Sequence, residues 1–151
     1  MSRKAVKYMS KIVLIVDDED MIQELLTVNL KRLQSPLEVF NSRTGEQAIE
    51  MYQSLMDEGK RPDLVVMDLN LSGEERMDAI EKHMTNKDTL DGVRTTKKIL
   101  ELDPTACIWG YTAWFDTDWS KVLEKYADRI VERTTSFHDF AEMVDRFFQR
   151  H

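Results

Sequence analysis

Aspartates follow two short apolar runs of the chain. Asp17 and Asp18 come directly after the run 11–16, and Asp68 comes directly after the run 64–67. Short runs rich in Val, Ile and Leu are typical of strands buried on both faces of a parallel sheet. Because an unpaired carboxylate is costly inside such a strand, we expect each aspartate to lie where its strand ends and meets solvent.

Three carboxylates in one crevice would repel one another unless their pKa values rise or a cation binds between them. Oxygen ligands without a neighbouring histidine or cysteine suit a hard cation such as Mg²⁺ or Mn²⁺. With such an ion in place, Asp68 could remain ionised and attack a phosphoryl group. Two later residues suit the same chemistry, because the Thr112 hydroxyl can donate a hydrogen bond and the Arg133 guanidinium can pair with phosphate oxygens.

Five strand-like segments alternate with amphipathic helical segments, and this alternation would bring the polar groups together. We predict strands at 11–16, 37–41, 62–67, 106–111 and 129–133, and helices at 21–34, 44–58, 91–102, 117–126 and 136–148. This pattern predicts an α/β fold with a doubly wound, five-stranded parallel sheet of the flavodoxin-like order 2-1-3-4-5. Its switch point lies between strands 1 and 3, where ligands bind at the carboxyl ends.

Local signals support the predicted helix boundaries. Thr44 followed by Gln47 resembles a capping box at a helix start, and Gly59 is a typical stop. Ser136 is placed to cap the last helix, whose apolar residues recur at helical spacing.

Composition excludes several classes of function. The chain has 151 residues, enough for one domain, and its net charge of −7 argues against binding to nucleic acid or to an acidic membrane. No apolar run approaches the roughly 18 residues of a membrane span, and no signal-peptide pattern follows the basic start. Cys107 is the only cysteine, so no internal disulfide can form. We therefore expect a cytoplasmic protein in which Cys107 is a small buried core residue.

Each candidate residue also has a purely structural explanation. The acidic run 17–20 could simply complement the dipole of the helix that follows it. The Thr112 hydroxyl could bond to backbone, Asp68 could be a turn residue, and Arg133 could be a surface cation. The placement of all of them at neighbouring strand ends is what favours a functional site.

The motifs resemble the receiver domain of two-component response regulators, the CheY-like family, over roughly 11–148. They read Leu-Ile-Val-Asp-Asp-Glu at 14–19, Pro-Asp-Leu-Val-Val-Met-Asp-Leu-Asn-Leu at 62–71 and Gly-Tyr-Thr-Ala at 110–113. The resemblance implies that Asp68 is the phosphoacceptor and that Thr112 is the switch hydroxyl. It implies that Mg²⁺ is held by Asp17, Asp18, Asp68 and the backbone carbonyl of Asn70.

The chain departs from the family pattern at several positions. Arg133-Thr134 stands where the family has Lys-Pro, and Ile130 stands where it has an aromatic switch residue. Arginine keeps the positive charge, but its planar guanidinium differs from an ammonium group. An insertion at about 72–89 separates Leu71 from Leu90-Asp-Gly92, which resembles the entry to helix 3 of the family. We divide the chain into an N-terminal extension (1–10) and a receiver domain (11–150) that contains this insertion.

The resemblance implies a phosphorylation switch rather than an enzyme that turns over a separate substrate. A sensor histidine kinase or a histidine phosphotransfer protein would phosphorylate Asp68. Phosphorylation would then reshape the face formed by helix 4, strand 5 and helix 5, to which a downstream protein of unknown identity would bind. The insertion is by default a solvated loop, although its position beside Asp68 also suits a lid or a docking segment.

Two other functions stay open at this point. A phosphatase of the haloacid dehalogenase type also uses an aspartate nucleophile and Mg²⁺, but its Asp-x-Asp motif lies on an early strand, whereas this chain has Asp68-Leu69-Asn70 on the third. A pseudo-receiver would be a pure binding module with a degenerate site. Neither His83 nor His138 is assigned a metal role, since both fall on predicted solvent-facing helix positions.

Overall fold

The computed structural model describes residues 10–34, 36–68, 92–113 and 118–150. Asn70, the insertion at 72–89 and most of the N-terminal extension lie outside these residues. Strands and helices alternate along the described chain in the order β1 (Lys11–Val16), α2 (Asp20–Lys31), β2 (Leu37–Ser42), α3 (Gly45–Asp57), β3 (Leu64–Met67), α5 (Gly92–Leu102), β4 (Ile108–Thr112), α6 (Asp118–Leu123), β5 (Arg129–Glu132) and α7 (Phe137–Arg150).

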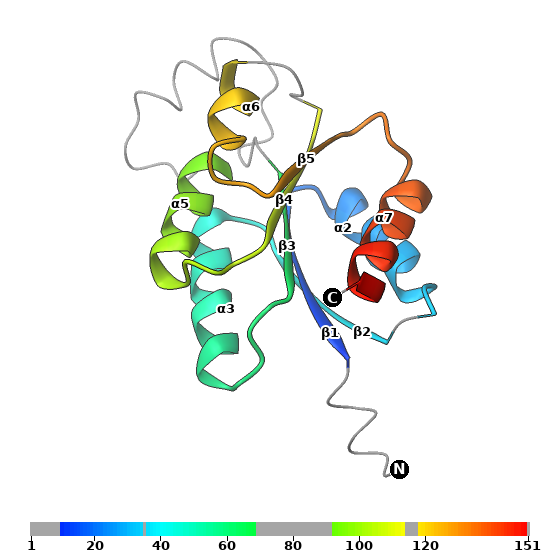
Figure 1. Ribbon diagram of the computed structural model, residues 1–151, viewed down its shortest axis with the longest axis horizontal. Helices are drawn as coiled ribbons and strands as arrows, with labels where there is room; N and C mark the ends of the chain where they lie inside the picture. The colour runs from blue at the N-terminus through cyan, green and yellow to red at the C-terminus, as the bar shows by residue number, and fades with distance from the viewer. Residues whose placement is uncertain (1–9, 35, 69–91, 114–117, 151) are drawn as a thin grey trace.

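All five strands form one parallel sheet in the order β2-β1-β3-β4-β5, which confirms the predicted fold class. Helices α3 and α5 lie on one side of the sheet, and α2 and α7 lie on the other (Figure 1). Val16 pairs with Met67 across β1 and β3, so these two strands end at the same level. The residues that follow them are therefore brought side by side.

Successive strand residues point into different cores, as the period of two in a strand requires. In β1, Val13 and Ile15 pack into the core shared with α2 and α7, whereas Leu14 and Val16 pack into the core shared with α3 and α5. All four of these side chains are fully buried. This explains why β1 is a continuous apolar run rather than an alternating one.

The helix starts follow the capping signals. The Thr44 hydroxyl accepts a hydrogen bond from the Gln47 amide (3.1 Å), and the Gln47 side chain accepts one from the Arg43 amide (3.0 Å). This arrangement is a capping box shifted by one residue, because the reciprocal bond is expected from Thr44 itself. The Ser136 hydroxyl accepts from the Asp139 amide (3.0 Å) at the start of α7. Gly59 has a φ of +74° just after α3, a conformation that favours glycine.

Several boundaries and exposures differ from the predictions. Helix α2 ends at Lys31 rather than near position 34, and α6 ends at Leu123, with turn structure following where the helix was predicted to continue. Cys107, which directly precedes β4, is only partly buried and packs against the edge of the core rather than within it. Met21 and Leu25 of α2 are 68% and 38% exposed, although they belong to the apolar stripe of that helix. In the part of the chain that the structure describes, no helix is long and apolar enough to cross a membrane.

Candidate functional site

Three carboxylates meet at the carboxyl end of the sheet. Asp17 follows β1 and is 2% exposed, and Asp68 follows β3 and is 9% exposed. One oxygen from each of Asp17, Asp18 and Asp68 lies within 4.8 Å of the others. The Asp68 amide donates to the Val16 carbonyl (2.9 Å), which joins the ends of the two strands. The structure therefore brings the carboxylates of the two distant acidic segments into one cluster, which we call the acidic pocket.

Backbone and side-chain hydrogen bonds hold the loop that carries Asp17 and Asp18. The Asp17 amide donates to the Ser42 carbonyl at the end of β2 (3.1 Å), and the Asp17 carboxylate accepts from the Glu19 amide (2.9 Å). The buried Gln23 side chain donates through Nε2 to the carbonyls of Asp17 (2.9 Å) and Ser42 (2.8 Å). Gln23 therefore fastens α2 to the ends of β1 and β2.

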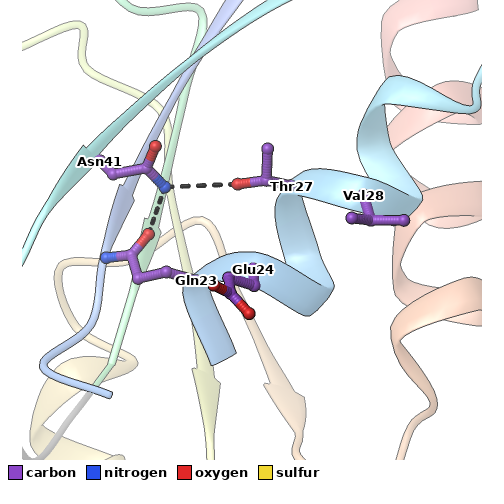
Figure 2. A pocket seen from close by; sticks show the side chains of 5 residues that line it. All are labelled: Gln23, Glu24, Thr27, Val28 and Asn41. Carbon is purple, nitrogen blue, oxygen red and sulfur yellow. Dashed lines mark hydrogen bonds between the residues drawn. The ribbon is translucent and has the colours of Figure 1, made fainter. Parts of the chain in front are cut away.

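Gln23 continues into a polar network between α2 and β2. Its amide oxygen accepts a hydrogen bond from Asn41 Nδ2, which also donates to the Thr27 hydroxyl (3.3 Å) (Figure 2). These three residues, with Glu24 and Val28, line an open pocket of about 350 Å³. Sequence reasoning missed Gln23, because a polar side chain in an amphipathic helix is usually assigned to solvent. Its spacing of three and seven residues from the buried Leu26 and Leu30 was the available signal.

Burial is the largest influence on the pKa values of Asp17 and Asp18. It raises the pKa of Asp17 to about 6, although the Glu19 amide and the Arg133 guanidinium both lower it. Burial also raises the pKa of Asp18. The Asp18 Oδ1 atom is buried and has no hydrogen-bond partner in the structure. A buried carboxylate oxygen without a partner is costly, so the pocket is incomplete without another donor or a cation.

Arg133 supplies a positive charge to the acidic pocket. It follows β5, and its Nη2 atom lies 3.1 Å from Asp17 Oδ2 and 3.6 Å from Asp68 Oδ1. Nη2 also donates to the Tyr111 carbonyl, and the guanidinium lies over the Tyr111 ring at 4.6 Å. The Nε atom of Arg133 is buried and has no hydrogen-bond partner, so one donor remains unused. Arg133 is thus part of the pocket rather than a surface cation.

Thr112 ends β4, next to β3, at the same end of the sheet as the acidic pocket. It is fully buried, and its carbonyl accepts a hydrogen bond from the Arg133 amide (2.9 Å). Ile130 packs on the opposite face of the sheet from Tyr111, in a small cluster with Val93 and Leu123. Asn70, the remaining predicted ligand, is outside the described residues.

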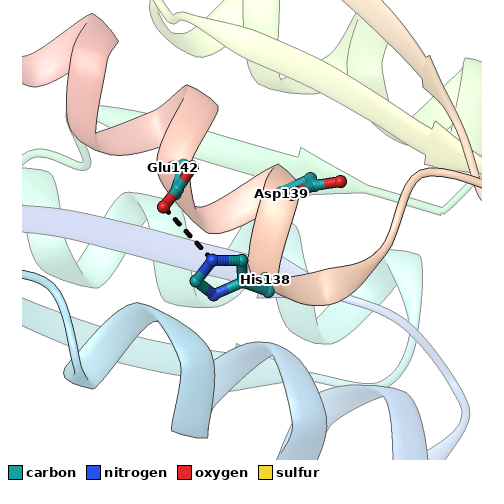
Figure 3. Close-up of side chains that lie close together, drawn as sticks. All are labelled: His138, Asp139 and Glu142. Carbon is teal, nitrogen blue, oxygen red and sulfur yellow. Dashed lines mark ion pairs between the residues drawn. The ribbon is translucent and has the colours of Figure 1, made fainter.

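The donor set of the acidic pocket fits a hard divalent cation. All three side chains offer carboxylate oxygens, and the unpartnered Asp18 Oδ1 is a ready ligand. A second acidic group lies at the start of α7, where Glu142 pairs with His138 at 3.2 Å (Figure 3). Those side chains are exposed, as predicted for His138, and an exposed pair four residues apart on a helix contributes little. The acidic pocket is therefore the stronger of these two candidate metal sites.

Comparison with known proteins agrees with the fold. The family model described as "Response regulator receiver domain" matches residues 13–145. The chain is 32% identical over 124 residues to protein-glutamate methylesterase/protein-glutamine glutaminase 1 of Syntrophus aciditrophicus (strain SB), a match that covers 80% of this chain and 29% of that protein. This chain thus spans less than a third of the length of that curated relative.

Solved structures show the same fold. The response regulator protein TrrA of Thermotoga maritima, in complex with Mg²⁺ and BeF, is 25% identical, with a TM-score of 0.65 over 90% of this chain and 97% of that one. A LuxR-family response regulator of Aurantimonas sp. SI85-9A1 is 18% identical, with a TM-score of 0.71 over 94% of this chain and 87% of that one. The chain belongs to the response regulator receiver domain family.

Proposed function

We propose that this receiver domain is switched by phosphorylation of Asp68, with Mg²⁺ held by Asp17, Asp18, Asp68 and the backbone carbonyl of Asn70. The observation that carries the proposal is the convergence of three carboxylates, one of which keeps a buried and unpartnered oxygen. The solved relative from Thermotoga maritima, described as a complex with Mg²⁺ and BeF, supports the choice of ion. When bound, Mg²⁺ would offset the charge of the carboxylates and of the incoming phosphoryl group.

The chemical step is a phosphoryl transfer between side chains. A carboxylate oxygen of Asp68 attacks the phosphorus of a phosphohistidine on a histidine kinase or a histidine phosphotransfer protein. The P–O bond forms as the P–N bond breaks, and the departing imidazole takes up a proton. Water later hydrolyses the acyl phosphate and returns the Asp68 carboxylate and inorganic phosphate. The protein thereby catalyses only its own phosphorylation and dephosphorylation.

Two neighbouring residues would stabilise the phosphorylated state. Arg133 already lies 3.6 Å from Asp68, and its unused Nε–H can donate to a phosphoryl oxygen. The Thr112 hydroxyl would donate to another oxygen of the same group. Both residues would exchange their present contacts for contacts to the phosphoryl group, and the surface near β5 and α7 would change for a downstream partner.

The test is incubation with acetyl phosphate and Mg²⁺, followed by intact mass measurement of the wild type and of Asp68→Asn. We expect one added phosphoryl group in the wild type and none in the variant. Addition of EDTA should abolish the reaction. Sustained turnover of a generic phosphate ester would instead favour a phosphatase. A folded protein that responds to neither acetyl phosphate nor beryllofluoride would favour a pseudo-receiver.

The phosphodonor is expected to dock on α2. Met21, Leu25 and Val28 are exposed at positions i, i+4 and i+7 of this helix, which begins two residues after Asp18. An apolar stripe of this spacing suits the apolar face of a partner helix. Leu25→Glu should slow phosphorylation by a phosphotransfer protein about tenfold or more and leave phosphorylation by acetyl phosphate unchanged. Equal slowing with both donors would show that the substitution damages the pocket rather than the docking surface.

A further inference from the structure

Tyr111 contacts both the acidic pocket and the start of α7. It lies on β4, it is 1% exposed, and its ring packs in the core between the sheet and α7. On the pocket side, the Arg133 guanidinium lies 4.6 Å from the ring centroid and donates to the Tyr111 carbonyl. Since the same guanidinium is 3.1 Å from Asp17, the position of Arg133 depends on Tyr111 as well as on the carboxylates.

On its other side, Tyr111 is tied to the corner between β5 and α7. Its hydroxyl donates to the Thr135 carbonyl in that corner. Its ring stacks on Phe140 of α7, with centroids 4.3 Å apart and an interplanar angle of 7°. The ring also meets Phe137 edge-on, at 5.9 Å and 85°. We call the segment 134–137, which follows Arg133, the β5–α7 corner.

The side chain at position 130 does not provide this link. Ile130 packs with Val93 and Leu123, on the face of the sheet covered by α5 and α6. Tyr111 packs on the opposite face, with α7. Among the described residues, the side-chain contacts that link Arg133 to α7 therefore run through Tyr111.

We propose that Tyr111 is a positioning residue that holds Arg133 in the acidic pocket and couples the position of Arg133 to the β5–α7 corner. Arg133 has two alternative sets of partners, the carboxylates of the pocket or an anion bound at Asp68. When it exchanges one set for the other, its contacts to the ring and carbonyl of Tyr111 change. The hydroxyl bond to Thr135 and the stacking on Phe140 carry that change to α7. This second step rests on the proposed function of Asp68, whereas the positioning of Arg133 does not.

The coupling is tested by backbone NMR of the protein with and without Mg²⁺ and beryllofluoride. In the wild type we expect shifts at Asp68 and Thr112 in the site and at Thr135 and Phe137 in the β5–α7 corner. Tyr111→Phe removes only the hydroxyl, so the site shifts should persist while the corner shifts fall to less than about half. Corner shifts of wild-type size in Tyr111→Phe would overturn the coupling.

The matched control is Trp109→Phe, two residues earlier on the same face of β4. Trp109 also packs against Phe140 (6.0 Å, 85°) and carries a guanidinium over its ring, that of Arg129 at 4.9 Å. Arg129 pairs with Trp109 at the opposite end of β5 from Arg133. Trp109→Phe should therefore leave both sets of shifts in place. Loss of the corner shifts in this control would show that core packing in general, rather than Tyr111, carries the response.

The positioning step is tested separately in the protein without ligand. Tyr111→Leu removes the ring, so hydrogen exchange at Arg133 Nε–H should become about tenfold faster than in the wild type. Tyr111→Phe keeps the ring, so its exchange should stay as slow as in the wild type. Unchanged exchange in Tyr111→Leu would overturn the positioning role. A wild type that shows no shift at Asp68 with beryllofluoride would refute the proposed function and the coupling together. The exchange measurement would still decide whether Tyr111 positions Arg133.

Discussion

Arg133 gives the acidic pocket a positive charge of its own. Its guanidinium lies 3.1 Å from Asp17 and 3.6 Å from Asp68, and only 18% of its side chain is exposed. Electrostatic interactions at such distances are strong where water is largely excluded. The same geometry makes Arg133 a competitor for any cation that binds the carboxylates.

Removal of this charge should strengthen metal binding. Arg133→Met keeps much of the side-chain volume and removes the competing guanidinium, so we expect the Kd for Mg²⁺ to fall about tenfold or more. A calorimetric titration at mildly alkaline pH, where the carboxylates are ionised, measures this change. The control is Arg129→Met, which removes a charge at the other end of β5, away from the pocket, and should have little effect. Weaker Mg²⁺ binding by Arg133→Met would show that the guanidinium supports the site instead of competing for it.

At the scale of the elements, α2 does more than cover the sheet. Its first turns carry Gln23, whose amide nitrogen reaches the carbonyl of Asp17 at the end of β1 and that of Ser42 at the end of β2. The geometry of the acidic pocket therefore depends on where this helix packs. A loop held only by its own backbone would leave Asp17 and Asp18 less precisely placed.

Substitution of Gln23 should affect both stability and metal affinity. Gln23→Met has a similar volume but donates no hydrogen bond, so the free energy of unfolding should fall by about 2 kcal/mol. We also expect weaker Mg²⁺ binding, because the loop with Asp17 and Asp18 loses an anchor. Urea unfolding and a Mg²⁺ titration measure the two effects. Thr27→Val, which removes only the 3.3 Å bond to Asn41, is the control and should leave the Mg²⁺ affinity unchanged. A purely structural Gln23 would lower stability alone.

The elements were more predictable than the contacts between them. The parallel sheet order followed from the alternation of strand-like and helix-like segments along the chain. β1 matches its predicted range, because a run of buried β-branched residues bounded by charges has few alternative structures. The end of α6 was not predictable, since the residues after Leu123 continue a helical pattern but form turns. The exposure of Met21 was missed for a related reason. Periodicity marks a stripe, whereas the packed neighbours decide how much of it is covered.

The candidate site also has features that could be predicted from the sequence and features that could not. The convergence of Asp17, Asp18 and Asp68 could be inferred, because sheet order places the ends of β1 and β3 together. The ion pairs of Arg133 with Asp17 and Asp68, and its place over the Tyr111 ring, could not be inferred. They depend on the side-chain path after β5, which no local pattern encodes.

At the scale of the whole molecule, another buried carboxylate stabilises the end of the sheet opposite the acidic pocket. Asp103 follows α5, is 7% exposed, and accepts hydrogen bonds from Tyr52 of α3 (2.6 Å) and from Arg61 (3.0 Å). Burial alone would raise its pKa, but the bonds from Tyr52, Thr105 and Arg61 outweigh burial and lower the pKa to about 2. This carboxylate links α3, α5 and the segment before β3.

The lowered pKa predicts a loss of stability in acid. An aspartate with a folded pKa of about 2 and an unfolded pKa of 3.8 stabilises the fold above the unfolded value, by about 2 kcal/mol. This contribution is lost as the pH falls from about 4 through about 2, when the folded form is also protonated. The difference in unfolding free energy between the wild type and Asp103→Asn, measured in urea, should therefore shrink as the pH is lowered through this window. A difference that stays constant with pH would contradict the assignment.

The outermost strands of the sheet limit how this protein can associate. β2 and β5 are its two edge strands. β5 has only four residues, of which Arg129 and Glu132 are exposed. A short edge strand with charged side chains, such as β5, opposes pairing with a strand from another chain, because that pairing would bring the charges against a new neighbour. Growth of the sheet between molecules is thereby discouraged, which protects against aggregation. Recognition of other proteins is left to the helices and loops that surround the sheet.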